Sequence, residues 1–369
     1  MSHATLKASY SLTADRGPAF VTNSQAILNS YSPWRPSASV TESGMRITEL
    51  ENSELTYEKK HEFNVGIDLG FLKNRLNLAA DYYRRNNFDL IGVINTQGAG
   101  GTIAKYANIA SMKSSGIELT ISSKNMRTKD FSWNTDFIFS KTKNEITDLK
   151  SHANVLSLIS GNGFGREGYP VRGLFSIPFA GLTEDGLPTF INQDGQKTIS
   201  SFNFQEYEKL DFLKYEGPTD PTITGSFGNI LTYKNLKLNV FVTYSFGNVI
   251  RLDPVFSNAY SDLDAMPKEF KNRWMKAGDE NVTNIPTIVS TRMNQQYAYL
   301  NMAYNAYNYS DVRIADGGFI RLKEISLSYD LPAKVINFFR LNKLQLKLQA
   351  TNLCLLLSLI HISEPTRRS

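Results

Sequence analysis

The chain has 369 residues, of which 41% are hydrophobic and 20% are charged, and its formal net charge is +5 at pH 7. The mean hydropathy is −0.30 and no run of about 18 apolar residues occurs, so a transmembrane helix is excluded. The basic residues are scattered rather than clustered, which argues against a nucleic-acid-binding surface. Cys354 is the only cysteine, so no internal disulfide can form, and the four histidines are too far apart for a metal site.

The N-terminus lacks the features of a signal peptide, because no basic segment precedes an apolar one. Residues 6–12 already alternate between apolar and polar side chains, as a β-strand does. The sequence therefore predicts a chain that begins inside a fold, without a signal sequence.

Alternating apolar and polar residues recur along the chain and predict strands with one apolar face. The clearest runs are residues 63–69, 76–82, 117–121, 236–242 and 344–348. Most of the predicted strands reach about 9–12 residues, the length of a tilted membrane-spanning strand, whereas globular strands average about 5–6. Strand length thus favours a membrane β-barrel over a soluble sandwich.

The predicted connections are of two kinds. Short polar turns are expected at residues 72–74, 124–129, 234–235 and 340–342, and long loops at 98–115, 143–221 and 248–317. The long loops all fall at the same end of alternate hairpins, as in transmembrane barrels with short periplasmic turns and long extracellular loops.

One predicted strand, residues 319–331, changes its alternation part-way. Ile320 and Leu322 have one parity, and the apolar residues from Ile325 onward have the other. A β-bulge near Glu324 explains the change, and so does a strand that leaves the membrane at this point.

Several short motifs, in order, resemble the barrel of SusC/RagA-type TonB-dependent transporters. They lie at residues 52–60, 64–71, 74–76, 81–83, 108–112, 116–120, 131–135, 144–146, 167–170, 316–329 and 350–353. The longest begins Asp316-Gly317-Gly318-Phe319-Ile320-Arg321. The resemblance covers about residues 6–353.

This resemblance implies an all-β, antiparallel transmembrane barrel in the outer membrane of Bacteroidota-type bacteria. Of the 22 strands expected in the family, about 10–11 are predicted here, within a partial barrel domain at residues 1–353; the plug domain and signal peptide are not recognisable. The implied function is nutrient import of glycans, oligosaccharides or peptides, and the protein is not expected to be an enzyme. The implied partners are a SusD-like lid lipoprotein, the TonB complex and outer-membrane lipid, and no nucleic acid or cofactor is expected.

The last residues depart from the family pattern. From about Cys354 to Ser369 the sequence resembles a translated sequencing-library adapter, where the family would continue into a loop and a closing strand. We expect residues 354–369 to be a non-native tail; a natural amphipathic C-terminus is the alternative.

No catalytic or metal-binding constellation emerges from the sequence. Asp185-Gly186 and Asp194-Gly195 lack the spacing of a calcium loop and predict turns instead. Asp68 and Glu118 lie on polar strand faces, where they are expected to line the lumen or pair with cations.

A tyrosine-rich tract in the last long loop is the candidate contact site for the lid or the substrate. It comprises Tyr297, Tyr299, Tyr304, Tyr307 and Tyr309. Tyrosine offers rigid amphipathic contact area, and the intervening asparagines offer adaptable hydrogen bonds. The alternative is a loop packed on itself or an interfacial aromatic girdle.

Two other classes of protein share some of these features. A soluble or surface β-rich carbohydrate-binding or carbohydrate-processing protein would have the aromatic residues and long loops, but not the strand length or the one-sided loops. A barrel adhesin or porin would differ in lacking a plug.

Overall fold

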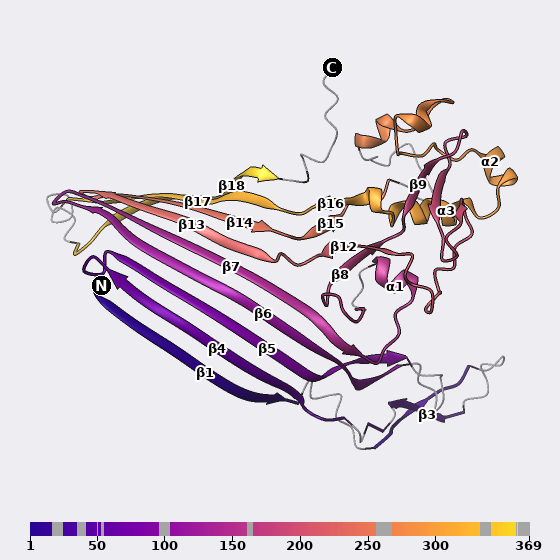
Figure 1. Ribbon diagram of the computed structural model, residues 1–369, viewed down its shortest axis with the longest axis horizontal. Coiled ribbons are helices and arrows are strands. Elements are labelled where there is room, and N and C mark those ends of the chain that lie inside the picture. Colours follow the sequence, from indigo (N-terminus) through magenta and orange to yellow (C-terminus); the bar gives the residue numbers. More distant parts are fainter. Residues whose placement is uncertain are drawn as a thin grey trace.

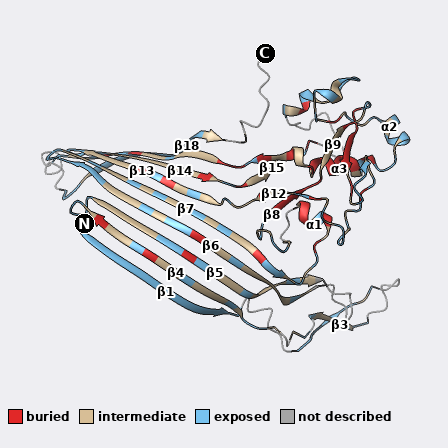
Figure 2. Ribbon diagram, in the orientation of Figure 1, coloured by how far each residue is buried: buried red, intermediate tan, exposed pale blue. Residues whose placement is uncertain are grey.

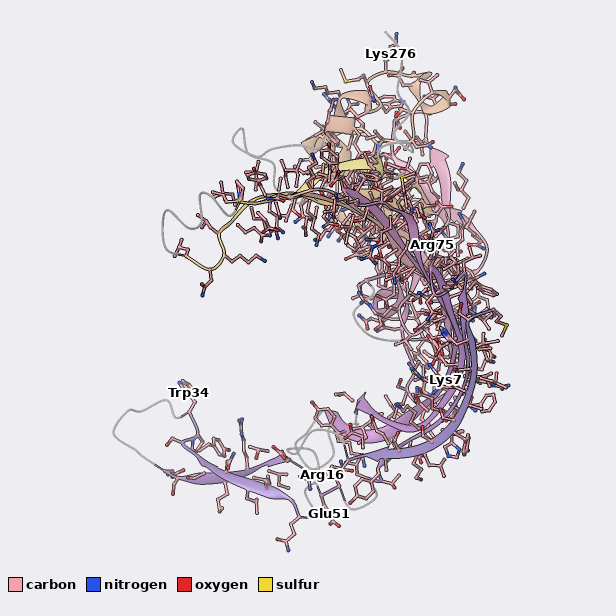
Figure 3. All side chains as sticks on the ribbon, turned by 90° about the vertical axis from the view of Figure 1, so that its left-hand side faces the viewer. Lys7, Arg16, Trp34, Glu51, Arg75 and Lys276 are labelled. Atoms are coloured by element: carbon pink, nitrogen blue, oxygen red, sulfur yellow. The ribbon has the colours of Figure 1, made fainter. Side chains whose placement is uncertain are left out.

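The computed structural model describes residues 1–16, 25–34, 42–49, 51–52, 55–95, 104–160, 165–255, 268–332, 341–358 and 360. Its main feature is one antiparallel nine-stranded sheet, curved in cross-section like part of a barrel wall (Figure 3). In spatial order the strands are β1 (His3–Asp15), β4 (Glu58–Phe71), β5 (Leu76–Asn95), β6 (Ala104–Arg127), β7 (Phe131–Leu149), β13 (Ile223–Tyr233), β14 (Leu236–Phe246), β17 (Phe319–Asp330) and β18 (Gln345–Ser358). No helix of the described residues is long and apolar enough to cross a membrane.

The all-β antiparallel fold is confirmed, but the described residues place nine strands in this sheet rather than ten or eleven. The difference arises because strand-like segments inside the long connections form separate small sheets. One of these is the hairpin of β2 (Ile27–Tyr31) and β3 (Gly44–Glu49), which lies between β1 and β4 in the chain.

Three strands are longer than the sequence predicts. β5, β6 and β7 have 20, 24 and 19 residues, so residues 104–115 and 143–149, expected in long loops, continue the sheet. Their backbone groups pair with each other in this region, which keeps the three strands together beyond the length needed to cross a bilayer.

The short turns gather at one end of the sheet and the long connections at the other, as predicted (Figure 1). At the first short turn, Leu72, Lys73 and Asn74 all have positive φ, and the Arg75 amide donates to the Phe71 carbonyl at 3.0 Å. At the turn after β13, the Asn235 side chain donates to the Asp330 carbonyl at 2.8 Å. The predicted turn at 340–342 lies partly outside the described residues.

The bulge predicted near Glu324 is confirmed. Phe241 pairs with Glu324 and the next residue, Val242, pairs with Leu322, so Lys323 is the extra residue of β17. The bulge returns the apolar residues on both sides of it to the same face of the sheet.

The two faces of the sheet differ in polarity. Exposed apolar side chains such as Leu6, Ile67 and Leu348 share one face. The buried residues of the strands belong mostly to the other face and include Tyr83, Ser226, Ser245, Ser326 and Ser328. Among the described residues no second layer covers these strands, so the burial results from curvature, which crowds side chains together on the concave face. The polar face is therefore the concave one.

Aromatic residues border the apolar band at its short-turn end. Trp133, Tyr233 and Tyr329 are exposed on the outward face of β7, β13 and β17, and the Trp133 indole donates to the Asn229 side chain at 2.8 Å. Such a belt is typical of the membrane–water interface, where an aromatic ring keeps an apolar body and a polar tip.

The long connections at the other end fold into a lobe with its own core. It contains α1 (Val155–Ser160), β8 (Gly173–Ser176), β9 (Phe179–Leu182), β10 (Pro188–Ile191), β11 (Lys197–Thr198), β12 (Lys214–Pro218), β15 (Val249–Arg251), η3 (Lys268–Asn272), η4 (Asp279–Asn281), α2 (Thr291–Gln296), α3 (Leu300–Asn308), η5 (Asp311–Arg313) and β16 (Ile314–Asp316). Figure 2 shows buried residues concentrated here, whereas they occur singly along the long strands. The expected loops at 143–221 and 248–317 are thus largely a compact folded unit.

The end of β18 departs from the polarity of the sheet. Residues 353–357 are Leu-Cys-Leu-Leu-Leu, and Leu355 faces Arg321 across the ladder on the concave side. Two register shifts interrupt the pairing of β17 with β18 in this region. Residues 359 and 361–369 lie outside the described part of the chain.

The two faces of β6 have different surroundings, so a lysine introduced on each face should affect stability differently. Leu119→Lys, on the outward face, is expected to destabilise the assembled protein by about 2–4 kcal/mol, because its ammonium would lie in hydrocarbon. Thr120→Lys, one residue along on the concave face, is the matched control and should cost little. The heat-modifiable gel mobility of the folded protein, measured across a denaturant series, reports both; equal effects would contradict the assignment of faces.

Candidate functional site

The concave face carries paired charges and hydroxyl groups. Lys7 of β1 forms an ion pair with Asp68 of β4, and the Ser122 hydroxyl donates to Asp136 at 2.6 Å. Asp68 thus has the cationic neighbour that the sequence predicts. Glu118 lies on the same face, in register with Asp81 and Ser140. This surface offers hydrogen bonds and charge to a hydrated solute.

An aromatic ring is fixed in the middle of this face. The Tyr83 side chain packs against Gly116, where any Cβ would come within about 2.6 Å of the ring. Its hydroxyl shares a hydrogen bond of 3.1 Å with the Thr142 hydroxyl, and the Arg85 guanidinium lies 4.3 Å from the ring centroid. Arg85 is in turn held by an ion pair with Glu62 at 3.0 Å. These contacts prevent the tyrosine from moving freely into the lumen.

The lobe is built around aromatic packing. Phe175, Phe190 and Tyr307 are fully buried, and the rings of Phe179 and Tyr307 meet edge to face at 5.8 Å. Edge-to-face pairs of this kind add stability beyond the burial of their area. A second, smaller cluster is formed by Leu187, Leu300, Ala303 and Tyr304.

Two arginines tie the segments of the lobe together. Arg251 of β15 donates to the carbonyl oxygens of Ile159 at 3.1 Å and of Phe175 at 2.7 Å, which joins α1 to β8. Burial lowers the pKa of the Arg251 guanidinium to about 10, so it stays charged at neutral pH. Arg313, 2% exposed, forms an ion pair with Glu269 at 2.7 Å and donates to the Asp253 carbonyl.

Neither arginine is recognisable as a functional residue from the sequence. Each is a single basic residue within a long connection and carries no local motif. Their partners are mostly backbone carbonyls of distant segments, and these partners are brought together only by the fold.

The tyrosine tract divides into core and surface residues. Tyr304 and Tyr307 are 2% and 1% exposed, and the Tyr304 hydroxyl donates to the Thr287 carbonyl at 2.6 Å. Burial raises the pKa of Tyr307 to about 12. The half-buried Tyr309 packs on the same core, with the Arg251 guanidinium 5.3 Å from its ring. These three match the alternative of a loop packed on itself.

The other two tyrosines are closer to solvent. Tyr299 is 69% exposed, with a φ of 63° immediately before α3. Tyr297 is half-buried, and its hydroxyl donates to Asp185 at 3.1 Å, a bond that raises the pKa of this tyrosine. Tyr299 is therefore the member of the tract whose ring is accessible to another molecule.

Both Asp-Gly pairs lie in turns, as the sequence predicts. The amides of Gly186 and Gly195 each donate to a carbonyl three residues back at 2.9 Å, and both glycines have φ near 75°. The described part of the chain contains no group of three or more side chains placed to hold a metal ion.

Known relatives match between about half and most of the chain. TonB-dependent receptor P3 of Formosa agariphila is 25% identical over 333 residues, which are 84% of this chain and 31% of the receptor. TonB-dependent receptor SusC of Bacteroides thetaiotaomicron is 28% identical over 240 residues, which are 58% of this chain and 23% of SusC. No family model matches the sequence.

Among solved structures, the RagAB peptide transporter superposes with a TM-score of 0.75 at 23% identity, over 97% of this chain and 37% of that chain. At this identity the likeness shows the fold. The chain resembles the barrel of SusC/RagA-like TonB-dependent transporters. Its localisation is accordingly the outer membrane. The chain spans about a third of the length of the first curated relatives that it matches.

The outer-membrane localisation gives the sheet an orientation. Short turns of such barrels face the periplasm and long loops face the outside. The lobe is thus extracellular, the concave face lines the lumen, and the outward face contacts lipid.

The buried Arg313 provides a test of how the lobe is held together. Arg313→Met should destabilise the lobe by about 2–4 kcal/mol, because the Glu269 carboxylate and the Asp253 carbonyl lose their partner. Hydrogen exchange of α3 and β8 in the assembled protein measures the loss of protection. Arg172→Met removes an exposed ion pair with Asp220 and is the matched control, expected within about 1 kcal/mol of wild type. Equal exchange in both variants would contradict the role of Arg313.

Proposed function

We propose that this chain forms part of the wall and an extracellular lobe of an outer-membrane nutrient importer. The observation that carries the proposal is the two-faced sheet, which has an apolar outward face and a polar concave face lined by ion pairs and hydroxyl groups. A large hydrated solute can form hydrogen bonds along the polar concave face. The apolar outward face contacts the hydrocarbon chains of the lipid.

The proposed cargo is a glycan, an oligosaccharide or a peptide. A peptide is the cargo named for the structural neighbour RagAB, whereas a glycan or oligosaccharide rests on the resemblance to the SusC/RagA family. We further propose a SusD-like surface lipoprotein as the lid over the lobe, with energy supplied through TonB. The matched relatives are receptors and transporters, which favours a protein that moves its solute unchanged rather than an enzyme.

Within the tyrosine tract we propose Tyr299 as the contact residue for the lid or the substrate. Its ring is exposed at the start of α3, and a planar exposed ring suits a sugar face or an apolar side chain. Tyr304 and Tyr307 would act only indirectly, by holding α3 in place. Tyr297 and Tyr309 would likewise only support the segment that carries Tyr299.

The experiment is a deletion of the gene in its native host, followed by growth on oligosaccharides or on oligopeptides as the sole carbon source. Loss of growth on one class, restored by the complete gene, supports import and identifies the cargo. A strain carrying Tyr299→Ala should show roughly 3–10-fold slower uptake, in keeping with the loss of one aromatic contact of about 1 kcal/mol. Tyr207→Ala, which removes another exposed tyrosine of the lobe, is the matched control.

Growth of the deletion strain on every substrate would argue against import. The alternative function, a soluble or surface-attached carbohydrate-binding or carbohydrate-processing protein, predicts that the chain is released by washing without detergent. Retention of the chain in the detergent-solubilised outer membrane would argue against that alternative.

We also infer that residues 354–369 do not belong to the native barrel. The apolar run at 353–357 places Leu355 on the polar concave face and coincides with irregular pairing. Long-read sequencing of the genomic locus tests the inference. We expect the genomic reading frame to depart from this sequence near Cys354, and a genomic copy that encodes the tail without interruption would disprove the idea.

A further inference from the structure

Basic side chains gather on the outward face of the sheet immediately beyond its apolar band. Cross-strand neighbours on β5, β6 and β7 form successive rows across this face. From the short turns outward the rows are Leu78, Ile121 and Phe137; Ala80, Leu119 and Phe139; Tyr82, Ile117 and Lys141; Arg84, Ser115 and Lys143; and Asn86, Lys113 and Glu145. The face thus changes from fully apolar to basic within two rows.

The level of this change matches the edge of a bilayer. From Leu76 at the short turn to Arg84 the strand rises by eight residues, which is about 20 Å once a strand tilt near 40° is allowed for. The apolar band of an outer-membrane barrel is about 25 Å tall. The backbone of the basic rows therefore lies just inside the outer edge of the band, from where the long side chains of arginine and lysine reach the lipid headgroups of the outer leaflet.

The basic residues outnumber their acidic partner. Glu145 accepts from Lys113 at 2.8 Å and lies 3.8 Å from Lys143. Within the described part of the chain, Arg84 and Lys141 have no ion pair. Four cations facing one carboxylate leave a net charge of about +3 on a surface that borders lipid, which calls for an anionic partner.

The same residues border a hollow on the surface. It has a volume of about 320 Å³ and is lined by Tyr82, Arg84, Lys113, Ser115, Lys143 and Glu145, among others. A guanidinium and two ammonium groups around one hollow suit phosphate oxygens, which accept several charge-assisted hydrogen bonds at once. The exposed Tyr82 ring forms the side of the hollow nearest the apolar band.

We propose that this basic cluster, Arg84, Lys113, Lys141 and Lys143, binds the phosphorylated headgroup of a glycolipid in the outer leaflet. The acyl chains of the lipid lie against the apolar rows below the cluster, and its phosphate lies among the four cations. The inference depends on the outer-membrane localisation and not on the imported cargo, so it stands or falls separately from the proposed import.

Native mass spectrometry of the complete outer-membrane protein, purified in detergent from its native host, tests this binding. The probes are phosphorylated lipid A, the same lipid after enzymatic dephosphorylation, and inorganic phosphate. Wild-type protein should bind the phosphorylated lipid at least 10-fold more tightly than the dephosphorylated lipid. Arg84→Gln/Lys113→Gln/Lys143→Gln should weaken binding of the phosphorylated lipid on the order of 100-fold, at about 5-fold for each basic residue near a membrane surface.

Two further variants make the outcome decisive. Lys73→Gln/Lys129→Gln removes positive charge at the short-turn end and should bind the lipid as wild type does. Lys113→Arg/Lys143→Arg keeps the charge and should also retain binding, which separates loss of charge from a folding defect.

Three results would overturn the proposal. They are equal binding of phosphorylated and dephosphorylated lipid, unchanged binding by the triple Gln variant, and full competition by millimolar inorganic phosphate. Either of the first two results would mean that the basic cluster contacts lipid headgroups in general and does not bind a phosphorylated lipid specifically. The third would mean that the hollow is a site for the free ion.

Discussion

The structure depends on one constraint: a backbone in hydrocarbon must satisfy its hydrogen bonds within the protein. The antiparallel ladder of nine strands does this for every interior strand. Once the ladder is fixed, the side chains must alternate between lipid and lumen, and the apolar rows of β4 to β7 follow from that. The outer edges of β1 and β18 have no partner strand among the described residues, and in a membrane these edges require further strands.

Outside the membrane the constraint changes, and so does the architecture. The lobe folds around aromatic rings, the half-buried Arg251 and the buried Arg313, because its long chain segments have few regular backbone partners of their own. Arg251 and Arg313 supply donors to the carbonyl oxygens of segments far apart in sequence. An extracellular surface held in this way can present an exposed residue such as Tyr299 on a fixed support, while Tyr304 and Tyr307 fill the core beneath it.

The barrel was largely predictable from the sequence, whereas the lobe was not. Alternation along residues 63–69 and 76–82 reports directly which face meets lipid, and even the bulge at Lys323 is visible as a change of parity. The lobe depends on contacts between residues more than 50 positions apart, such as Arg251 with Ile159, and no local pattern encodes them. For the same reason the tyrosine tract suggested a surface, although only long-range packing decides that Tyr307 is buried and Tyr299 is exposed.

The most direct test of the two-faced membrane wall is accessibility along β6. Single cysteines at each position from 117 to 122 are introduced into a cysteine-free form of the complete protein, spin-labelled and reconstituted in lipid. We expect high collision rates with oxygen at positions 117, 119 and 121, and high rates with a water-soluble nickel chelate at 118, 120 and 122. Uniform accessibility to the chelate along the strand would contradict the account, because the sheet would then be hydrated on both faces.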